Sequence, residues 1–139
     1  MKIAVINGPN LNLLGSREPE IYGHQTLEDL YAQLDSSFPD VELSFFQSNH
    51  EGELIDFIQD CQQEGFDGIV INPGAYAHTS IALADALQSI RVPAIEVHIS
   101  NIYRRESFRH HSYTAAACQG TISGLGFRGY HLAIQYFVH

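Results

Sequence analysis

Residues 68–90 read GIVINPGAYAHTSIALADALQSI, and the pattern of this stretch decides the fold. Gly68–Ile71 is apolar on consecutive residues, which is typical of a strand buried on both faces in a parallel sheet. The polar loop NPGAYAHTS follows, and helical spacing predicts a helix over Ser80–Ile90, capped by Thr79 or Ser80. The stretch therefore predicts one strand–loop–helix unit of an α/β protein.

The same alternation continues on both sides of this unit. Further apolar, β-rich runs are Ile3–Ile6, Val41–Phe46, Ala94–Ile99 and Thr121–Leu125, and helical patterns cover Leu27–Ser37, Glu53–Glu64 and Tyr130–Phe137. Strands that alternate with helices imply right-handed crossovers and helices on both faces of the sheet. Five units in 139 residues predict a single flavodoxin-like domain over residues 1–139, an α/β three-layer sandwich with a five-stranded parallel sheet.

The charge balance limits the class of partner. The formal charge is −9, from 16 acidic against 7 basic residues, which argues against nucleic acid or an anionic membrane as a partner. Three of the bases, Arg104, Arg105 and Arg109, cluster in one segment. A small anionic substrate in a local cationic pocket is therefore compatible with the composition.

The cysteines and the apolar runs indicate the compartment. Cys61 falls in register with the apolar face of a predicted helix and Cys118 follows three alanines, so both are predicted to be buried thiols. We expect no disulfide framework, in keeping with a reducing cytoplasm. The apolar run after Lys2 is too short for a signal peptide, and we expect no membrane span.

Polar side chains follow four of the predicted strands. In open parallel sheets, ligands bind beyond the carboxyl ends of the strands, so these side chains are expected to converge on one small-molecule site. Turns without function favour Gly, Asp and Ser, whereas these loops carry Asn, His, Tyr and Arg. The loops are Asn7–Gly23, Asn49–Glu51, Asn72–Thr79 and Glu96–Arg109.

The fourth loop begins with an acid–base pair. Glu96 and His98 are two residues apart, so a strand places them on one face, and the carboxylate can fix the tautomer of the imidazole. The backbone N–H groups of Ile99, Ser100 and Asn101 then leave the strand and can bind a carboxylate or a phosphate.

Several chemistries are excluded by missing motifs. The chain has no GK[ST] triplet, no GxSxG elbow and no HExxH pair. The only lysine, Lys2, lies at the opposite end of the first strand from the expected site, which argues against an imine mechanism. A zinc site on His78, His98 and Glu96 stays open, although it lacks a characteristic spacing. Proton transfer, with asparagines holding an oxyanion or a water, fits best.

The segment LGSREPEIYG, residues 14–23, then supplies a base. Two glycines and a proline make it too broken for a helix, so we expect a mobile loop. A free phenol is a poor base at neutral pH, but a guanidinium within a few Å favours the tyrosinate. Arg17, together with Arg109, is the predicted cation beside Tyr22, which could then remove a proton next to a carbonyl.

Four segments together carry a family resemblance. INGPNLNLLGSREPEIYG, FFQSNHEGELID, INPGAYAHTSIALADAL and EVHISNIYRRESFRHHS resemble, in order, the type II 3-dehydroquinases. The resemblance implies dehydration of 3-dehydroquinate to 3-dehydroshikimate in the shikimate pathway, by anti elimination through an enolate, with no cofactor and no metal. It also implies a flavodoxin-like fold and a dodecamer built as a tetramer of trimers.

The resemblance also implies a role for each matching residue. The catalytic matches are Tyr22 as base, Arg17 as lid arginine, Asn12 as holder of the water on the enolate oxygen, His98 as general acid and Glu96 as the group that orients it. The substrate-binding matches are Asn72, His78 and Arg109 for hydroxyls, Ile99 and Ser100 for the carboxylate, and Asp85 for a neighbouring subunit's site. Tyr103 and Arg104 depart from the family pattern, and both are expected outside the site.

Two other classes of function are compatible with the fold alone. One is a binding module for a flavin or nucleotide, although the loops lack a phosphate-cradling glycine run. The other is a structural oligomer whose loops form subunit contacts.

Overall fold

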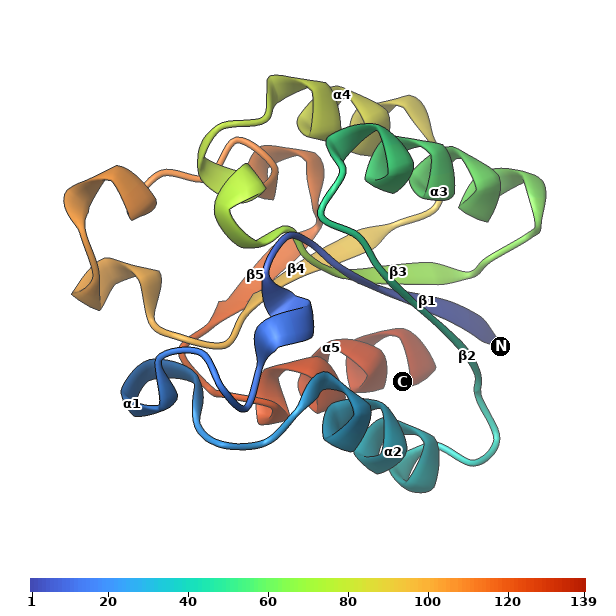
Figure 1. The fold of residues 1–139 in the computed structure, drawn as a ribbon. Helices are drawn as coiled ribbons and strands as arrows, with labels where there is room; N and C mark the ends of the chain where they lie inside the picture. Colours follow the sequence, from blue (N-terminus) through green and yellow to red (C-terminus); the bar gives the residue numbers. More distant parts are fainter.

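The central sheet consists of five parallel strands. A computed structural model describes residues 1–139, in which the strands pair in the order β2-β1-β3-β4-β5 (Figure 1). The predicted flavodoxin-like α/β fold is confirmed, because every strand pair is parallel. The strands are β1 Lys2–Asn7, β2 Glu42–Gln47, β3 Gly68–Asn72, β4 Ala94–His98 and β5 Gly120–Ser123.

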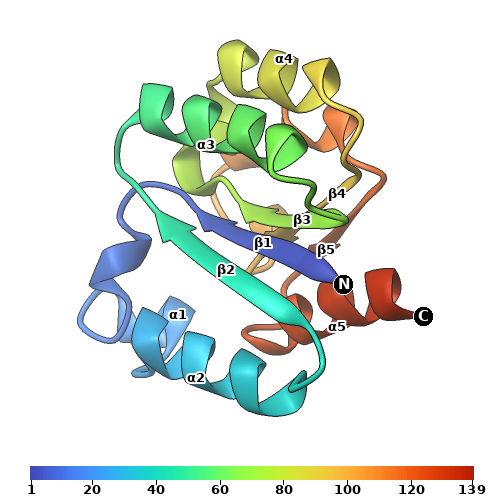
Figure 2. The same ribbon diagram turned by 90° about the vertical axis from the view of Figure 1, so that its right-hand side faces the viewer.

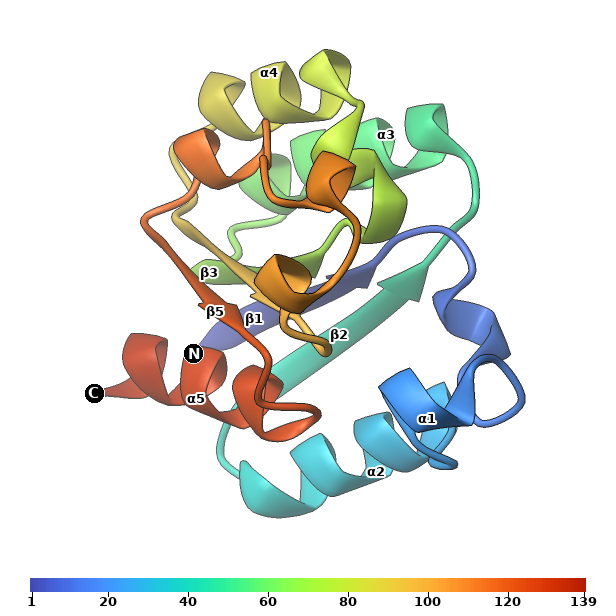
Figure 3. The ribbon, with the colours of Figure 1, turned by 90° about the vertical axis from the view of Figure 1, so that its left-hand side faces the viewer.

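Helices cover both faces of this sheet. Figures 2 and 3 show α2 (Leu27–Ser37) and α5 (Arg128–Val138) on one face, and α3 (Glu51–Gln63) and α4 (Ile81–Ser89) on the other. Alternate residues of a strand point to opposite faces, so β1 divides its apolar side chains between two cores. Ile3 and Val5 pack with α2 and α5, and Ala4 and Ile6 pack with α3 and α4. None of the helices is long and apolar enough to span a bilayer.

Local signals explain where the helices begin. Thr26 and Asp29 form a reciprocal capping box at the start of α2, which satisfies two of its free N–H groups. Ser80, rather than Thr79, caps α4, because its hydroxyl accepts from the N–H of Leu83 at 2.9 Å.

A short helix in the first loop was not predicted. Residues Pro19–Tyr22 form α1, so the expectation that residues 14–23 are too broken for a helix was wrong. The proline and the glycine that suggested a break instead bound the helix. Pro19 begins α1 with a pre-set φ, and Gly23 ends it at φ 81°. Tyr22 is therefore presented from the last position of a helical turn.

The loops after β1 and β3 touch where the strand order reverses. Gly8 N–H donates to the carbonyl of Asn72 at 2.8 Å, and a Cβ on Gly8 would lie 2.3 Å from the carbonyl oxygen of Pro73. Only a glycine allows this approach of the two backbones. The position next to it is the switch point at which open α/β sheets bind ligands.

Gly8→Ala is expected to lower the free energy of unfolding by about 1–3 kcal/mol, because the new methyl group overlaps the Pro73 backbone. Gly52→Ala is the matched control, since a Cβ there meets no atom within 4 Å. In α3 it should be neutral or stabilise by up to about 1 kcal/mol. Urea unfolding of both variants measures the difference, and equal effects would contradict the proposed close contact.

Candidate active site

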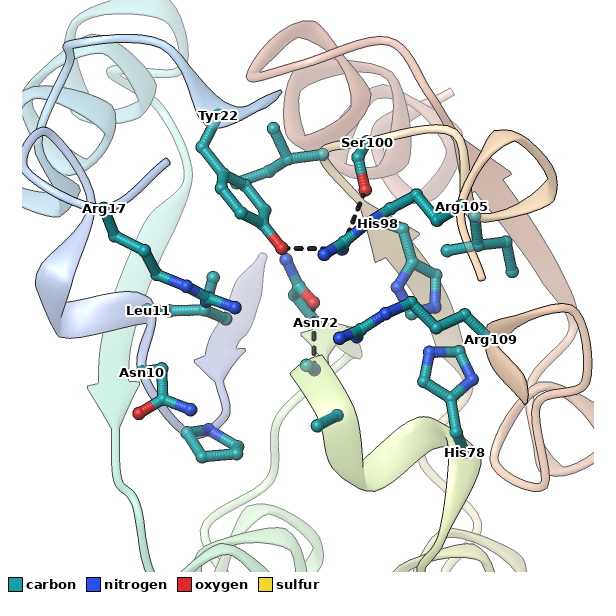
Figure 4. Close-up of a pocket in the computed structure, with 15 residues that line it drawn as sticks. Asn10, Leu11, Arg17, Tyr22, Asn72, His78, His98, Ser100, Arg105 and Arg109 are labelled. Atoms are coloured by element: carbon teal, nitrogen blue, oxygen red, sulfur yellow. Dashed lines mark hydrogen bonds between the residues drawn. The ribbon is translucent and has the colours of Figure 1, made fainter. Parts of the chain in front are cut away.

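One cavity lies beyond the carboxyl ends of β1, β3 and β4 (Figure 4). Its volume is about 140 Å³, which suits a small metabolite better than a dinucleotide. Asn10, Leu11, Ile102 and Arg105 are among its walls. Most of the predicted site residues also line it, namely Arg17, Tyr22, Asn72, His78, His98, Ile99, Ser100 and Arg109.

Three predicted site residues lie outside this cavity. Glu96 is fully buried behind His98. Asn12 is exposed, and its Oδ1 accepts from Gln47 Nε2 at 3.4 Å instead of facing the cavity. Asp85 is exposed on α4. Asn10, two residues before Asn12, lines the cavity and Asn12 does not.

The acid–base pair on β4 has the expected geometry. His98 Nε2 lies 2.8 Å from Glu96 Oε2, and the hydroxyls of Ser112 and Thr114 donate to the same carboxylate. Burial alone raises the pKa of Glu96, but the hydrogen bond and charge of His98 and these two hydroxyls together hold it below its ordinary value. Glu96 is therefore an anion that occupies Nε2, which leaves Nδ1 of His98 for a ligand.

His78 is held as a neutral acceptor. Burial lowers its pKa, the backbone hydrogen bond to His111 opposes this, and the charges of His98 and Arg109 lower it further. Its Nδ1 lies 2.8 Å from the carbonyl oxygen of His111, so Nδ1 carries the proton. Nε2 of His78 is then an acceptor for a ligand hydroxyl. The ring centroids of His78 and His98 lie 6.0 Å apart.

Two guanidinium groups flank Tyr22. Arg105 Nη1 donates to the Tyr22 oxygen at 2.7 Å, and the guanidinium carbon of Arg17 lies 4.7 Å from the ring centroid (Figure 4). Arg109, also expected in this role, makes no hydrogen bond to Tyr22, and its Nε donates to Glu106 at 3.1 Å. Arg105 was missed as a site residue. The sequence did place Arg105 in the cluster with Arg104 and Arg109, but it could not show which of these arginines contacts the Tyr22 hydroxyl.

A cradle for an anion follows β4. The N–H groups of Ile99 and Ser100 donate to no acceptor within the chain, although Ile99 is only 6% exposed. Buried backbone N–H groups without partners are rare in folded proteins. Arg105 also approaches the Ser100 hydroxyl at 3.4 Å. These donors together make a site for a carboxylate.

The SNHEGE segment joins the first and third loops. Asn49 Oδ1 accepts from the N–H of Asn10, which is held at φ 69°, and the carbonyl of Asn49 accepts from Tyr76 at 2.8 Å. Both loops line the cavity, so Asn49 fixes the spacing of its two walls without entering it.

The zinc alternative finds no support in the side-chain arrangement. No group of three or more His, Cys, Asp or Glu side chains is placed to hold a metal ion, so His78, His98 and Glu96 do not form a ligand set.

The fold and this site define a class: an α/β enzyme of flavodoxin-like architecture with a cationic cavity for a small anion at its switch point. The family described as Dehydroquinase class II matches residues 1–138. A 3-dehydroquinate dehydratase of Idiomarina loihiensis is 59% identical over 96% of this chain and 90% of its own, and one of Deinococcus radiodurans is 55% identical over 96% and 95%. The type II dehydroquinase structure from Butyrivibrio crossotus superposes with a TM-score of 0.98 at 51% identity, covering 100% of this chain and 98% of its own.

The chain belongs to the class II dehydroquinase family. The predicted resemblance is confirmed. Family membership decides against a flavin- or nucleotide-binding module and against a purely structural protein.

Glu96→Gln is expected to remove a pH-dependent part of the stability. Because the folded-state pKa of Glu96 lies below 4.5, the ionised side chain stabilises the fold above that pH. This contribution is lost as the pH falls through the lower, folded-state pKa. Urea unfolding of both proteins between pH ~7 and pH ~3.5 should show the largest difference at the upper end. A difference that grows toward acid pH would contradict an ionised Glu96.

Proposed function

We propose that this chain removes water from 3-dehydroquinate in the shikimate pathway, by anti elimination through an enolate and without a cofactor. The observation that carries the proposal is that Tyr22 and His98 line one cavity together with three guanidinium groups. The relatives named above as 3-dehydroquinate dehydratases support the same substrate.

Tyr22 acts in this proposal as the base. Arg105 donates a hydrogen bond to its oxygen, and the guanidinium of Arg17 lies over its ring, so two positive charges lie beside this phenol. The tyrosinate takes the proton next to the substrate carbonyl, and the electron pair moves to the carbonyl oxygen to give an enolate. Asn12 was expected to hold a water on that oxygen. We assign this task to Asn10 instead, because Asn10 lines the cavity and Asn12 does not.

His98 acts as the general acid. Protonated Nδ1 gives its proton to the departing hydroxyl as the enolate collapses, the C–O bond breaks and water leaves. Glu96 at Nε2 fixes the ring and stabilises the imidazolium before transfer. Acid and base both line the same cavity, as an elimination requires.

The remaining groups hold the substrate. Its carboxylate fits the N–H groups of Ile99 and Ser100, which have no acceptor within the chain. Hydroxyl groups are assigned to Asn72, to Nε2 of His78 and to Arg109. The product 3-dehydroshikimate keeps the carboxylate and gains a conjugated double bond.

We also propose an assembly in which Asp85 serves a neighbouring copy. Asp85 is exposed on α4 and does not line the cavity of its own chain. A dodecamer built from trimers is the expected form. Both cysteines are free thiols, which is compatible with the expected cytoplasmic location.

Tyr22→Phe is expected to lower kcat by about 10²–10⁴-fold, because the phenylalanine keeps the ring but removes the base. Tyr103→Phe is the matched control, since Tyr103 is 65% exposed and lies outside the cavity. The absorbance of the conjugated product, followed continuously with purified 3-dehydroquinate, measures both. Full turnover by Tyr22→Phe would overturn the assigned base, and no turnover by the unsubstituted chain would overturn the proposed function.

Arg105→Met is expected to lower kcat by roughly 10²-fold, because it removes both the hydrogen bond and the positive charge at the Tyr22 oxygen, where the proposed proton transfer takes place. Arg104→Met removes the same charge from an exposed position next to it and should leave kcat within about twofold. The same absorbance assay applies. Equal losses in the two variants would mean that overall charge matters and the Arg105–Tyr22 contact does not.

A further inference from the structure

Tyr130 is a buried phenol that the proposed reaction does not use. It lies on α5 with no exposed surface and is not part of the cavity wall. A hydroxyl group in such a place must be hydrogen-bonded, because an unpaired one destabilises the fold. Both of its partners are asparagines at the carboxyl ends of adjacent strands.

The two asparagines lie side by side. Asn7 ends β1 and Asn72 ends β3, and the two residues are paired in the sheet register. They continue the alternation that places Val5 and Val70 on the face covered by α2 and α5. Both amide groups therefore project toward α5 and contact the Tyr130 oxygen. Asn7 is fully buried at this position.

The hydrogen bonds around Tyr130 can run in only one direction. Its single proton is donated to Asn7 Oδ1 at 2.6 Å, so its oxygen must accept from Asn72 Nδ2 at 2.9 Å. Burial raises the pKa of Tyr130, so the phenol keeps this proton throughout the ordinary pH range.

The other end of the Asn72 amide is fixed as well. Gly74 N–H donates to Asn72 Oδ1 at 3.1 Å. A flipped amide would set its NH₂ group against the N–H of Gly74 and its carbonyl oxygen against the lone pairs of Tyr130. Asn72 can therefore offer a ligand only one arrangement, in which the position of its remaining donor and acceptor is set.

We propose that Tyr130 is a positioning residue, which acts through Asn72 by fixing the amide orientation that meets the substrate hydroxyl. The proposal rests on the function proposed above. Among Tyr130, Asn7 and Asn72, only Asn72 lines the cavity, so any effect of Tyr130 on substrate must pass through it.

A positioning role and a purely structural role predict different kinetics. Asn72 contacts a hydroxyl that is present in both ground and transition states. Loss of its orientation should therefore raise KM and leave kcat nearly unchanged. A structural role would lower the amount of active protein, which reduces the apparent kcat and leaves KM as it was.

Tyr130→Phe tests this distinction. We expect KM to rise about threefold to tenfold, the effect of one neutral hydrogen bond, with kcat within about twofold. Tyr31→Phe is the matched control. The Tyr31 hydroxyl accepts from Asn7 Nδ2 at 3.4 Å, at the far end of the same chain of contacts, and it does not touch Asn72. Its KM should stay at the value of the unsubstituted chain.

A double-mutant cycle with Asn72→Ala completes the test. If Tyr130 acts through Asn72, adding Tyr130→Phe to Asn72→Ala should raise KM no further. Multiplicative effects of the two substitutions on KM, or an unchanged KM in Tyr130→Phe alone, overturn the proposal.

Asn7→Ala gives a second route should Tyr130→Phe fail to fold. It leaves the Tyr130 proton without its acceptor, so that proton turns toward Asn72 and opposes the native amide orientation. A rise in KM similar to that expected for Tyr130→Phe supports the proposal, and an unchanged KM overturns it.

The same assays separate failure of the positioning role from failure of the proposed function. Absence of turnover in the unsubstituted chain overturns the proposed function, and the positioning role with it. Turnover with KM unaffected by these substitutions overturns the positioning role alone.

Discussion

The parallel pairing of β1 with β3 is the constraint on which the site depends. It places Asn7 opposite Asn72 at the last residue pair of the two strands, and it brings together the loops that follow β1 and β3. The approach is so close that Gly8 has no room for a side chain beside Pro73. One loop carries Arg17 and Tyr22, and the other carries His78. A shift of β1 by one residue would turn Asn7 to the opposite face and separate it from Asn72 and Tyr130.

The second constraint is electrostatic. The chain carries a formal charge of −9, yet three guanidinium groups and no carboxylate line the cavity. Glu18 and Glu106 pair with these arginines outside the cavity, at N–O distances of 3.1–3.8 Å. Inside it, the positive charges face a region of reduced dielectric, where their mutual repulsion is less screened than in water. A bound anion relieves this repulsion, so these guanidinium groups favour binding of a small carboxylate.

Local sequence patterns predicted the parts of the fold that local forces decide. The five strands, the capping box at Thr26 and the polar carboxyl-end loops all depend on residues close in sequence. The short helix α1 was missed because Pro19 and Gly23 are read as breakers when they are also boundary residues. Arg105 was missed because its partner, Tyr22, is 83 residues away. The Tyr130–Asn72 bond spans 58 residues and joins a helix to a strand end. No periodicity within either element indicates such a contact.

The proposed acid and the proposed base lie on elements of different rigidity. His98 and Glu96 belong to β4, are almost fully buried and hydrogen-bond to each other, and the hydroxyls of Ser112 and Thr114 donate to the Glu96 carboxylate. Tyr22 comes from α1, a single turn that contributes no buried residue of its own. Segments with few buried contacts open more easily than strands in the core. The hydrogen bond from Arg105 therefore ties the loop that carries Tyr22, the proposed base, to the loop after β4, next to His98. In the proposed reaction, loop closure and chemistry are then linked, because a Tyr22 side chain displaced from Arg105 loses the hydrogen bond at its oxygen.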